Sequence, residues 1–476
     1  MASIVDTAGN PYGVKNILKI VHRNEGPENL LAKNDPLLRQ LKSERIEGKE
    51  YRFAALFGRG GAVSADYLTS KVAARQTVRN AEWKVVPGYL NSAFTVTQNE
   101  IVASRTKKGA YIRAVGQKVF ASLEAARKTL ARCLYGSGFG ELGQPLAAVS
   151  AGTTAGDPVT IYVDEVTAAS IDVGTNMVVA TGSITGTIKA GVLNVTAIGS
   201  KTATGIPVTV ICYSDATETT PAISPAIATT DWLELAGNQF AAEAAGTPVF
   251  PVGLGGWLPI NRPVSGDSFY GMDRSISPDR LAGQFVRQAD LPSGATKADT
   301  ISELFRLCRR AGGIPDVVML NDQDYAELLS EIGMKEVFQQ NINDALPDKL
   351  SVTSGKNQLA WAFASSWIGK TTPSPFIPKG TFYILERDNV QFLSFTNTER
   401  AFNDGVGAEE PGKPKGDEYE SETPGENPSA FLNLDDCITA EPGPGSNYGP
   451  DAIVTYRIIG TFVLWNTANS GVGLFS

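Results

Sequence analysis

The sequence predicts an α+β protein that carries an inserted small β-barrel or β-sandwich domain, and three observations support this prediction. Apolar residues recur at steps of three and four from about Ala103 to Leu134, which is typical of a long amphipathic helix. Short strand-like segments separated by turn residues fill residues 151–246, where Ala, Thr, Gly and Val are abundant. From Phe250 onwards, helix and strand patterns are mixed, which favours an α+β layer.

Composition excludes several classes of protein. The 476 residues suffice for about two to four structural units. No apolar run reaches the roughly 18 residues of a membrane span, and the start of the chain lacks the pattern of a signal peptide, so we expect neither membrane insertion nor export. The four cysteines are dispersed without a CxxC pair, which argues against a disulfide framework and a thiolate zinc site and favours a reducing compartment.

The charge of the chain is polarised. Residues 1–135 contain 22 lysines and arginines against 11 aspartates and glutamates, whereas the remainder contains 20 against 39. Such asymmetry fits nucleic acid lying against the basic part, or basic arms of one subunit lying on acidic surfaces of the next. Solvated faces with an accidental bias are the plainer alternative.

The N-terminal third is predicted to form an arm, a ribbon and a long helix. Residues 1–46 are an arm with one helix, in which Asn34 or Asp35 is the cap, Pro36 holds the first position, and Leu37, Leu38 and Leu41 share a face. Residues 47–101 are predicted to form a two-stranded ribbon built from Lys49–Phe57 and a return strand over Glu82–Gln98, with a short helix at its tip, and 47–86 are the part assigned as the extended loop. A first core segment, 87–150, carries the spine helix, about 103–135.

A glycine-rich segment follows the predicted spine helix. Gly138, Gly140 and Gly143 match GxGxxG in letters, but a phosphate-binding loop requires a strand before it and a helix after it. Here a helix precedes the glycines and Pro145 follows them. The favoured interpretation is a helix end with its glycine stop, and the less favoured one is a cofactor site.

Residues 151–248 are expected to form the inserted β domain. This stretch has few basic and aromatic residues, so a protruding or packing module is favoured over a nucleic-acid reader. The predicted strands are Thr160–Val163, Asn176–Ala180, Ser183–Ala190, Val192–Ile198 and Val208–Tyr213.

Residues 249–401 are predicted to complete the core. Residues 402–450 are predicted to form an extended acidic loop rich in Gly and Pro. Residues 451–476 are predicted to return as a strand, chiefly Ala452–Asn466, into an earlier sheet. The expected elements between them are a helix Ala298–Gly313 capped by Asp299 or Thr300, a strand Ile314–Leu320, a helix Asn321–Gly333, and two strands paired with each other, TFYILE at 381–386 and VQFLSF at 390–395.

No catalytic, cofactor-binding or metal-binding residue is predicted, and we expect the chain not to be an enzyme. The only histidine, His22, has no partner nearby in the sequence, and no Walker loop, HExxH or GxSxG motif is present. The candidate functional residues are instead basic side chains that could contact a neighbouring subunit or DNA phosphates. They are Arg59, Lys71 and Arg75 in the extended loop and Arg105, Lys107 and Lys108 before the spine helix.

The order of these segments resembles a known family. The stretches NDPLLRQLKSERIEGKEYRF, IVASRTKKGAYIRA and LYGSGFGELGQPL, followed after the insertion by GLGGWLPINRPVSGDSFYGMDRSISPDRLAGQ and AGGIPDVVMLNDQDYAELL, are similar to tailed-phage major capsid proteins of the Hong Kong 97-like fold. The resemblance covers most of the chain outside 150–248 and 402–450.

The resemblance implies a subunit with an N-terminal arm, an extended loop, a peripheral domain with the spine helix, and an axial domain. It also implies hexamers and pentamers in an icosahedral shell around double-stranded DNA, assembled in the host cytoplasm with a scaffolding protein, a portal and a decoration protein as partners. Some members crosslink a loop lysine to an asparagine, for which Lys71 is the candidate.

Three alternatives remain open from the sequence. The first is the shell protein of a bacterial nanocompartment, of the encapsulin kind, which shares the fold and encloses enzymes. The second is a nucleotide-dependent enzyme that uses the glycine-rich segment. The third is a surface adhesin that uses the β insertion.

Overall fold

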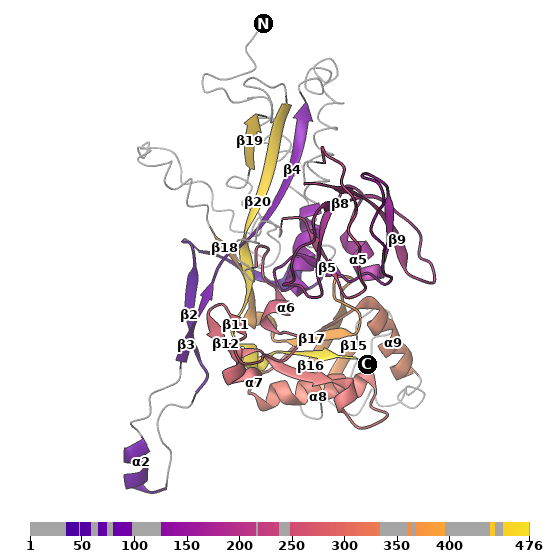
Figure 1. The fold of residues 1–476 in the computed structure, drawn as a ribbon. Helices are drawn as coiled ribbons and strands as arrows, with labels where there is room; N and C mark the ends of the chain where they lie inside the picture. Colours follow the sequence, from indigo (N-terminus) through magenta and orange to yellow (C-terminus); the bar gives the residue numbers. More distant parts are fainter. Residues whose placement is uncertain are drawn as a thin grey trace, which may run out of the picture.

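The computed structural model confirms a mixed α and β chain, in which the described residues form a two-stranded ribbon, a tall sheet, two six-stranded sheets and a short two-stranded sheet of β11 (Ser268–Phe269) and β12 (Met272–Asp273) (Figure 1). The structure describes residues 35–46, 48–58, 65–73, 80–97, 125–215, 218–237, 248–333, 359–363, 367–395, 438–442 and 451–475. All structural statements below concern these residues.

The tall sheet has five strands and is built from distant parts of the chain. Its path is β1 (Lys42–Ile46), β18 (Val390–Phe395), β20 (Asp451–Leu464) and β19 (Ile438–Pro442), and β4 (Gly88–Thr97) pairs with β20. β20 is antiparallel to β4 along the whole length of β4, so the predicted return of a late strand to an early sheet is confirmed. The loop prediction for 402–450 is wrong at β19, because this segment pairs with β20.

The end of the predicted spine helix packs against this sheet. Residues 125–135 are helical, whereas 103–124 lie outside the described residues. Leu130 and Leu134 are completely buried in a core that also contains Phe392 and Phe462 of the sheet. Burial of these large side chains supplies the main favourable free energy that joins helix and sheet.

The N-terminal arm differs from its prediction. Only one 3₁₀ turn, η1 (Leu38–Gln40), forms, and the chain then continues as β1, parallel to β18. The predicted cap is also wrong, because the N-cap position of this turn is Leu37, which makes no side-chain cap hydrogen bond. Asp35 lies just before it, and its carboxylate accepts hydrogen bonds from the backbone N–H of Leu37 at 2.9 Å and of Leu38 at 3.0 Å. Pairing with β18 therefore overrides the local helix pattern, as tertiary contacts often do.

The ribbon consists of β2 (Tyr51–Leu56) and β3 (Asn80–Val85), with the helix α2 (Tyr67–Ala73) at its tip (Figure 1). The tip helix was predicted. The single return strand was not correct, because the chain leaves the ribbon at Val86 and Pro87 and enters the tall sheet as β4. Pro87 has no N–H to donate, which suits a break between two strands.

A second sheet has six strands. Its order is β13 (Gln284–Arg287), β21 (Gly471–Leu474), β17 (Thr381–Leu385), β14 (Val317–Leu320), β16 (Trp367–Pro373) and β15 (Leu359–Phe363). The helices α8 (Lys297–Arg310) and α9 (Asp322–Gly333) lie on it (Figure 1), and its core includes Phe305 and Phe382.

The predicted pairing of TFYILE with VQFLSF is wrong. β17 pairs with β14 and β21 in the second sheet, whereas β18 pairs with β20 and β1 in the tall sheet. The one-turn helix η6 (Arg387–Asn389) separates them, and η8 (Thr467–Asn469) separates β20 from β21 in the same way. The chain therefore crosses between the two sheets twice through single 3₁₀ turns.

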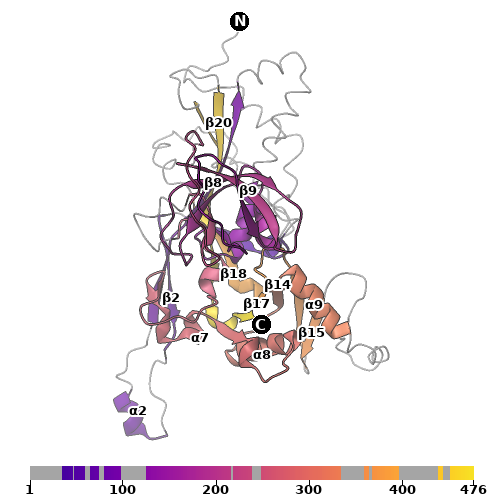
Figure 2. The ribbon, with the colours of Figure 1, turned by 45° about the vertical axis from the view of Figure 1, so that its right-hand side comes forward.

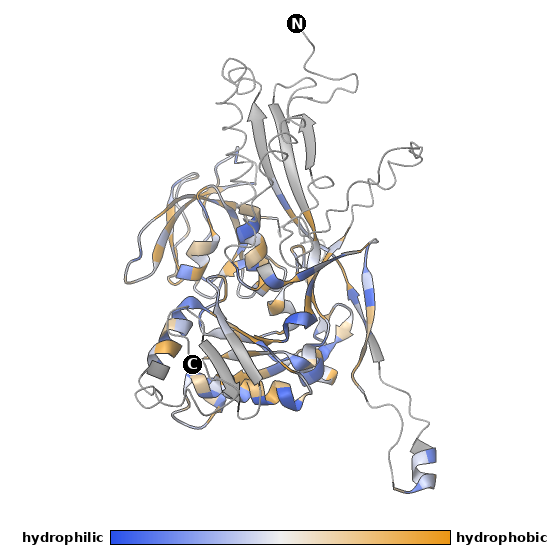
Figure 3. Cartoon of the chain, turned by 180° about the vertical axis from the view of Figure 1, so that it is seen from behind, coloured by the Kyte–Doolittle hydropathy of each residue, from blue (hydrophilic) through white to orange (hydrophobic). Residues whose placement is uncertain are grey.

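The predicted N-cap of helix α8, Asp299 or Thr300, is wrong. Thr296 is the N-cap, and it forms a capping box with Asp299, in which each side chain accepts a hydrogen bond from the backbone N–H of the other residue. The predicted apolar face is confirmed, since Ile301, Leu304 and Cys308 are fully buried. In the hydropathy colouring this helix is hydrophobic on one side and hydrophilic on the other (Figure 3).

The third sheet lies beside the tall sheet (Figure 2) and has the order β5 (Glu141–Gly143), β10 (Trp232–Leu235), β7 (Asn176–Ala180), β8 (Val192–Ile198), β9 (Ile206–Tyr213) and β6 (Val159–Val163). It also carries the short helix α5 (Glu165–Ser170), which was not predicted. The expected strand Ser183–Ala190 is wrong, because this segment is mostly turn and makes one isolated bridge, Ala180 to Ile188.

The glycine-rich segment performs a packing function. The returning chain packs against it, and the backbone N–H of Phe250 donates to the carbonyl of Gly138 at 2.9 Å. A Cβ atom on Gly140 would lie 2.6 Å from the Phe250 ring, and one on Gly143 would lie 2.1 Å from the Thr167 hydroxyl. Space that a phosphate would require is thus filled by side chains of the chain itself.

Candidate assembly surfaces

The base of the ribbon is attached to the body by aromatic side chains. Phe53 of β2 lies 5.1 Å from Trp465, and Trp83 of β3 lies 5.2 Å from Trp257, measured between ring centroids. Trp257 is 1% exposed, and its indole N–H donates to the carbonyl of Phe462 at 2.8 Å. Aromatic pairs of this kind add to the free energy gained by burial, so the ribbon base is a fixed part of the subunit.

The tip of the ribbon makes no comparable contacts within the described residues. Tyr67 is 73% and Leu68 is 67% exposed on the short helix α2, which Asp66 caps through the backbone N–H of Thr69 at 2.8 Å. Lys71 is exposed on the same helix. Two large apolar side chains at a projecting tip are typical of a surface that another molecule covers.

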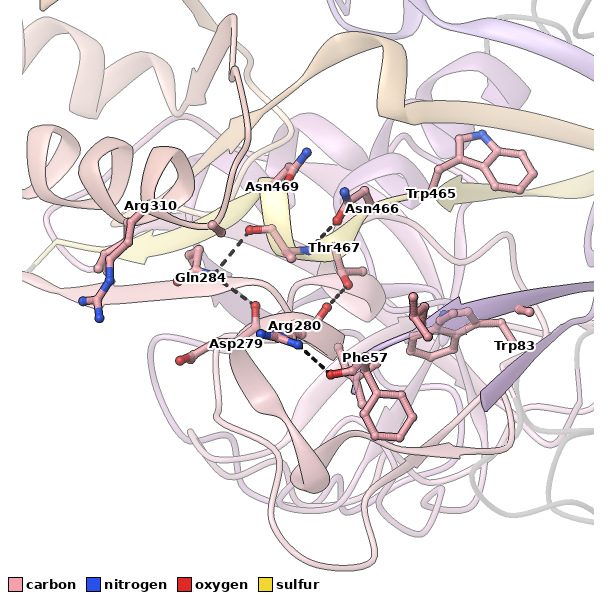
Figure 4. Close-up of a pocket in the computed structure, with 17 residues that line it drawn as sticks. Phe57, Trp83, Asp279, Arg280, Gln284, Arg310, Trp465, Asn466, Thr467 and Asn469 are labelled. Atoms are coloured by element: carbon pink, nitrogen blue, oxygen red, sulfur yellow. Dashed lines mark hydrogen bonds between the residues drawn. The ribbon is translucent and has the colours of Figure 1, made fainter. Parts of the chain in front are cut away.

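A groove lies between the ribbon base and the second sheet (Figure 4). It has a volume of about 670 Å³ and is lined by the end of β2, by α7 (Pro278–Leu281), by the last turn of α8 and by residues 465–469. Arg280 donates from Nη1 to the carbonyl of Phe57 at 2.7 Å and so connects α7 to the end of β2. Gln284 lies between the two walls, because its Nε2 donates to the carbonyls of Asp279 at 3.1 Å and Ala468 at 3.3 Å.

The charges around the groove are unequal. Asp279 is neutralised by Arg262, whose Nη2 lies 2.5 Å from its carboxylate. Arg280 and Arg310 have no carboxylate partner among the described residues. The groove is therefore basic, and a ligand with carboxylates would complement it.

A buried carboxyl joins the arm to two other parts of the body. Asp35 is 0% exposed, and besides the two backbone N–H groups it accepts hydrogen bonds from the Tyr135 hydroxyl at 3.3 Å and from the Ser374 hydroxyl at 2.7 Å. Burial without a cationic partner raises the pKa of this carboxyl, and the hydrogen bonds only partly oppose that effect. The arm is thus tied to the spine helix end and to the segment after β16.

The third sheet contacts the body through polar pairs. Lys128 of the spine helix lies 2.9 Å from Asp172, and Gln323 of α9 donates to the Glu165 carboxylate of α5. A hydrogen bond from Lys201 lowers the pKa of Glu165, which keeps this carboxylate ionised. Such exposed pairs orient the sheet more than they stabilise it.

The structure places only one of the six predicted site residues. Lys71 lies at the ribbon tip, and its contact with a neighbouring subunit stays a prediction. Arg59, Arg75, Arg105, Lys107 and Lys108 lie outside the described residues. The groove was not predicted from the sequence, because its walls come from four segments far apart in the chain and no local motif connects them.

The described residues give little support to metal binding, thiol reactivity or a membrane-spanning helix. No group of three or more His, Cys, Asp and Glu side chains there could hold a metal ion. Cys133 and Cys308 are buried, and burial raises the pKa of the Cys308 thiol to about 12, which leaves it protonated and unreactive. Within the same ranges, no helix combines the length and apolarity needed to cross a bilayer.

Comparisons with known proteins give similarities to shell proteins. No protein-family model and no curated protein sequence matches the chain. The cyanophage A-1(L) capsid asymmetric unit is 14% identical, with a TM-score of 0.47 over 93% of this chain and 92% of that one. The putative capsid protein of an E. coli prophage is 8% identical, with a TM-score of 0.39 over 97% and 98%.

The SrpI encapsulin from Synechococcus elongatus is 10% identical, with a TM-score of 0.36 over 96% of this chain and 94% of that one. Because all three TM-scores are below 0.5, the proposals below rest on the residues and geometry of this chain.

Proposed function

We propose that the chain is a major capsid protein of a tailed phage, with the Hong Kong 97-like fold, which self-assembles into hexamers and pentamers of an icosahedral head. The observation that carries this proposal is the projecting ribbon, which is fixed at its base and exposes Tyr67 and Leu68 at its tip. Two strands alone are marginal in water, so a ribbon of this kind is best stabilised by a neighbouring subunit. Function is then binding, without turnover.

In this proposal the elements have defined roles. Residues 1–46 are the arm, 47–86 the extended loop, and the tall sheet with the spine helix the peripheral domain. The second sheet is the axial domain, and the third sheet is an inserted small barrel. Support for the barrel comes from the edge strand β6, whose Tyr162 carbonyl accepts from the N–H of Leu146, just beyond the opposite edge strand β5.

The proposed partners are further copies of the chain, a scaffolding protein, a portal, a decoration protein and packaged double-stranded DNA. Contacts with DNA would be to phosphates and independent of sequence. Arg59, Arg75, Arg105, Lys107 and Lys108 remain the candidates for DNA or a neighbouring subunit. Reversing charge at Arg105, Lys107 and Lys108 is expected to impair assembly or genome packing while the monomer stays folded, and normal yields of filled particles would reject this role.

Electron microscopy of the expressed chain, with and without its scaffold, tests the proposal. Closed icosahedral particles are expected. Particles purified with an enzyme cargo and no DNA would favour the nanocompartment shell instead. Dinucleotide binding by the purified monomer would favour an enzyme, and carbohydrate binding by residues 151–246 would favour an adhesin.

A further inference from the structure

We propose that the groove at the ribbon base binds the acidic stretch 415–423 of a second copy of this chain, added as an extended strand to the free edge of β2. The inference rests on the proposed self-association, and it names a contact between copies that the ribbon tip does not make. Three observations support it: an unpaired strand edge, a basic groove beside that edge, and an alternating acidic sequence that complements both.

The first observation is the free edge of β2. Within the described residues the ribbon is a sheet of two strands, so β2 pairs with β3 on one side only. The residues that line the groove include Ala54, Ala55 and Leu56 at the end of β2, and Leu56 is 69% exposed. An unpaired edge offers a row of backbone N–H and C=O groups, which is the template used when a peptide adds a strand to a sheet.

The second observation is the chemistry of the facing wall. Arg280 and Arg310 lie on α7 and α8 across from β2, and Figure 4 shows Arg310 on the other side of Gln284 from Phe57. Asp279 does not cancel these charges, because it is paired with Arg262. A groove with two unmatched guanidinium groups and a strand edge fits an extended acidic peptide.

The third observation is the pattern of the acidic stretch. Residues 415–423, KGDEYESET, lie between Pro414 and Pro424 and contain no proline. In an extended strand, Glu418, Glu420 and Glu422 would share one face, because side chains alternate. Nine extended residues span up to about 30 Å, enough to follow the six residues of β2, and prolines at both ends would stop further pairing.

A second copy is favoured over the same chain because of where this stretch is attached. The preceding strand β18 and the following strand β19 both belong to the tall sheet, and β19 pairs with the end of β20 that starts at Asp451. Figure 1 shows this end of β20 at the opposite end of the molecule from α7, which lines the groove. DNA is a poorer occupant, since Arg280 and Arg310 are the only cations among the described residues that line the groove, whereas binding to a duplex relies on many phosphate contacts.

Peptide binding to the unassembled full-length chain tests the groove. The receptor carries Glu418→Gln, Glu420→Gln and Glu422→Gln, so that its own stretch does not compete, and the probe is a fluorescent KGDEYESET peptide followed by anisotropy. Arg310→Glu is expected to weaken binding at least about tenfold. Arg309→Glu is the matched control, because Arg309 is exposed in the same turn but does not line the groove, and it should bind normally.

Equal binding by the two charge-reversed receptors would overturn the proposal, as would absence of peptide binding to the unreversed receptor. Loss of DNA-duplex binding in Arg310→Glu, without any peptide binding, would assign the groove to nucleic acid and also overturn it. The peptide assay uses unassembled chain, so its result does not depend on particle formation. Normal peptide binding by a chain that forms no closed particles would reject the proposed function and leave the groove assignment in place.

A disulfide experiment distinguishes the second copy from the same chain. In a Cys437→Ser background, in which Cys133, Cys212 and Cys308 are buried, chains with Ala54→Cys are mixed with chains carrying Ser421→Cys. Mild oxidation should give a covalent heterodimer, and Arg310→Glu should prevent it. A disulfide formed within single chains of the double variant, with no heterodimer in the mixture, would overturn the assignment to a second copy.

Discussion

The two ends of the ribbon differ, although the same pair of strands leads to both. At the base, Phe53 and Trp83 pack against Trp465 and Trp257 inside the subunit. At the tip, Tyr67 and Leu68 of α2 are mostly exposed. The base therefore contributes to the stability of the monomer, whereas the tip would gain its stabilisation from another molecule.

The largest expected effect is on monomer stability and concerns the base. Trp257→Ala should lower the free energy of unfolding by about 3–5 kcal/mol, because it leaves a cavity among four aromatic rings and removes the hydrogen bond to Phe462. Denaturant unfolding of the unassembled chain measures this change. An effect below about 1 kcal/mol would break the claim that the base is fixed by the subunit itself.

The opposite result is expected at the tip. Changing Tyr67 and Leu68 together to serine should alter the free energy of unfolding of the monomer by less than about 0.5 kcal/mol, since both side chains are exposed. The same variant should form few or no closed particles, as counted by electron microscopy. Normal particle yields would show that the tip is not an assembly contact.

A third prediction concerns the other attachment inside the subunit, the buried carboxyl of Asp35. Its pKa is raised in the folded state, so its contribution to stability is present below the unfolded-state pKa, near 3.8, and is lost as the pH rises through the folded-state value. Asp35→Asn does not ionise and can keep hydrogen bonds to the arm and Ser374. The variant should therefore gain stability relative to the original chain as the pH rises above about 3.8, until the folded-state carboxyl of Asp35 is ionised. If the free energies of unfolding of the original chain and of Asp35→Asn change in parallel with pH, the result contradicts a raised pKa for Asp35.

The smallest effect is expected for the tip charge. Lys71→Glu should change the free energy of unfolding of the monomer by less than about 0.5 kcal/mol, because exposed charges contribute little. It should also reduce the particle yield less than the change of Tyr67 and Leu68 to serine does. Lys71→Arg, which keeps the charge, is the control for assembly. Shells boiled in denaturant should give only monomer bands, since no asparagine partner for Lys71 is identified, and higher bands lost in Lys71→Arg would reveal a crosslink.

Sequence patterns predicted the elements whose signals are local. The apolar face of α8, the tip helix α2 and the long strand β20 were all identified from periodicity and composition. The arm was misassigned because the leucines that suggest a helix are buried by a single turn before β1. β17 and β18 were assigned to one sheet because nothing in their sequences reveals that η6 redirects the chain to another.

The candidate site was less accessible to sequence reasoning than the fold. Lys71 is exposed on the tip helix α2, but exposure could have been inferred for many charged residues, and its role as a contact stays a prediction. The groove depends on Leu56, Arg280 and Arg310, which are brought together only by the packing of the ribbon against α7 and α8. Long-range packing of this kind leaves no periodic signal in the chain.

Electron microscopy of the full chain, expressed with and without its scaffold, tests the central claim most directly. If the chain assembles through the ribbon tip, the original chain should give closed icosahedral particles. The variant in which Tyr67 and Leu68 are both changed to serine should give folded but unassembled protein. A persistent monomer or dimer of the original chain, even with scaffold present, would contradict it.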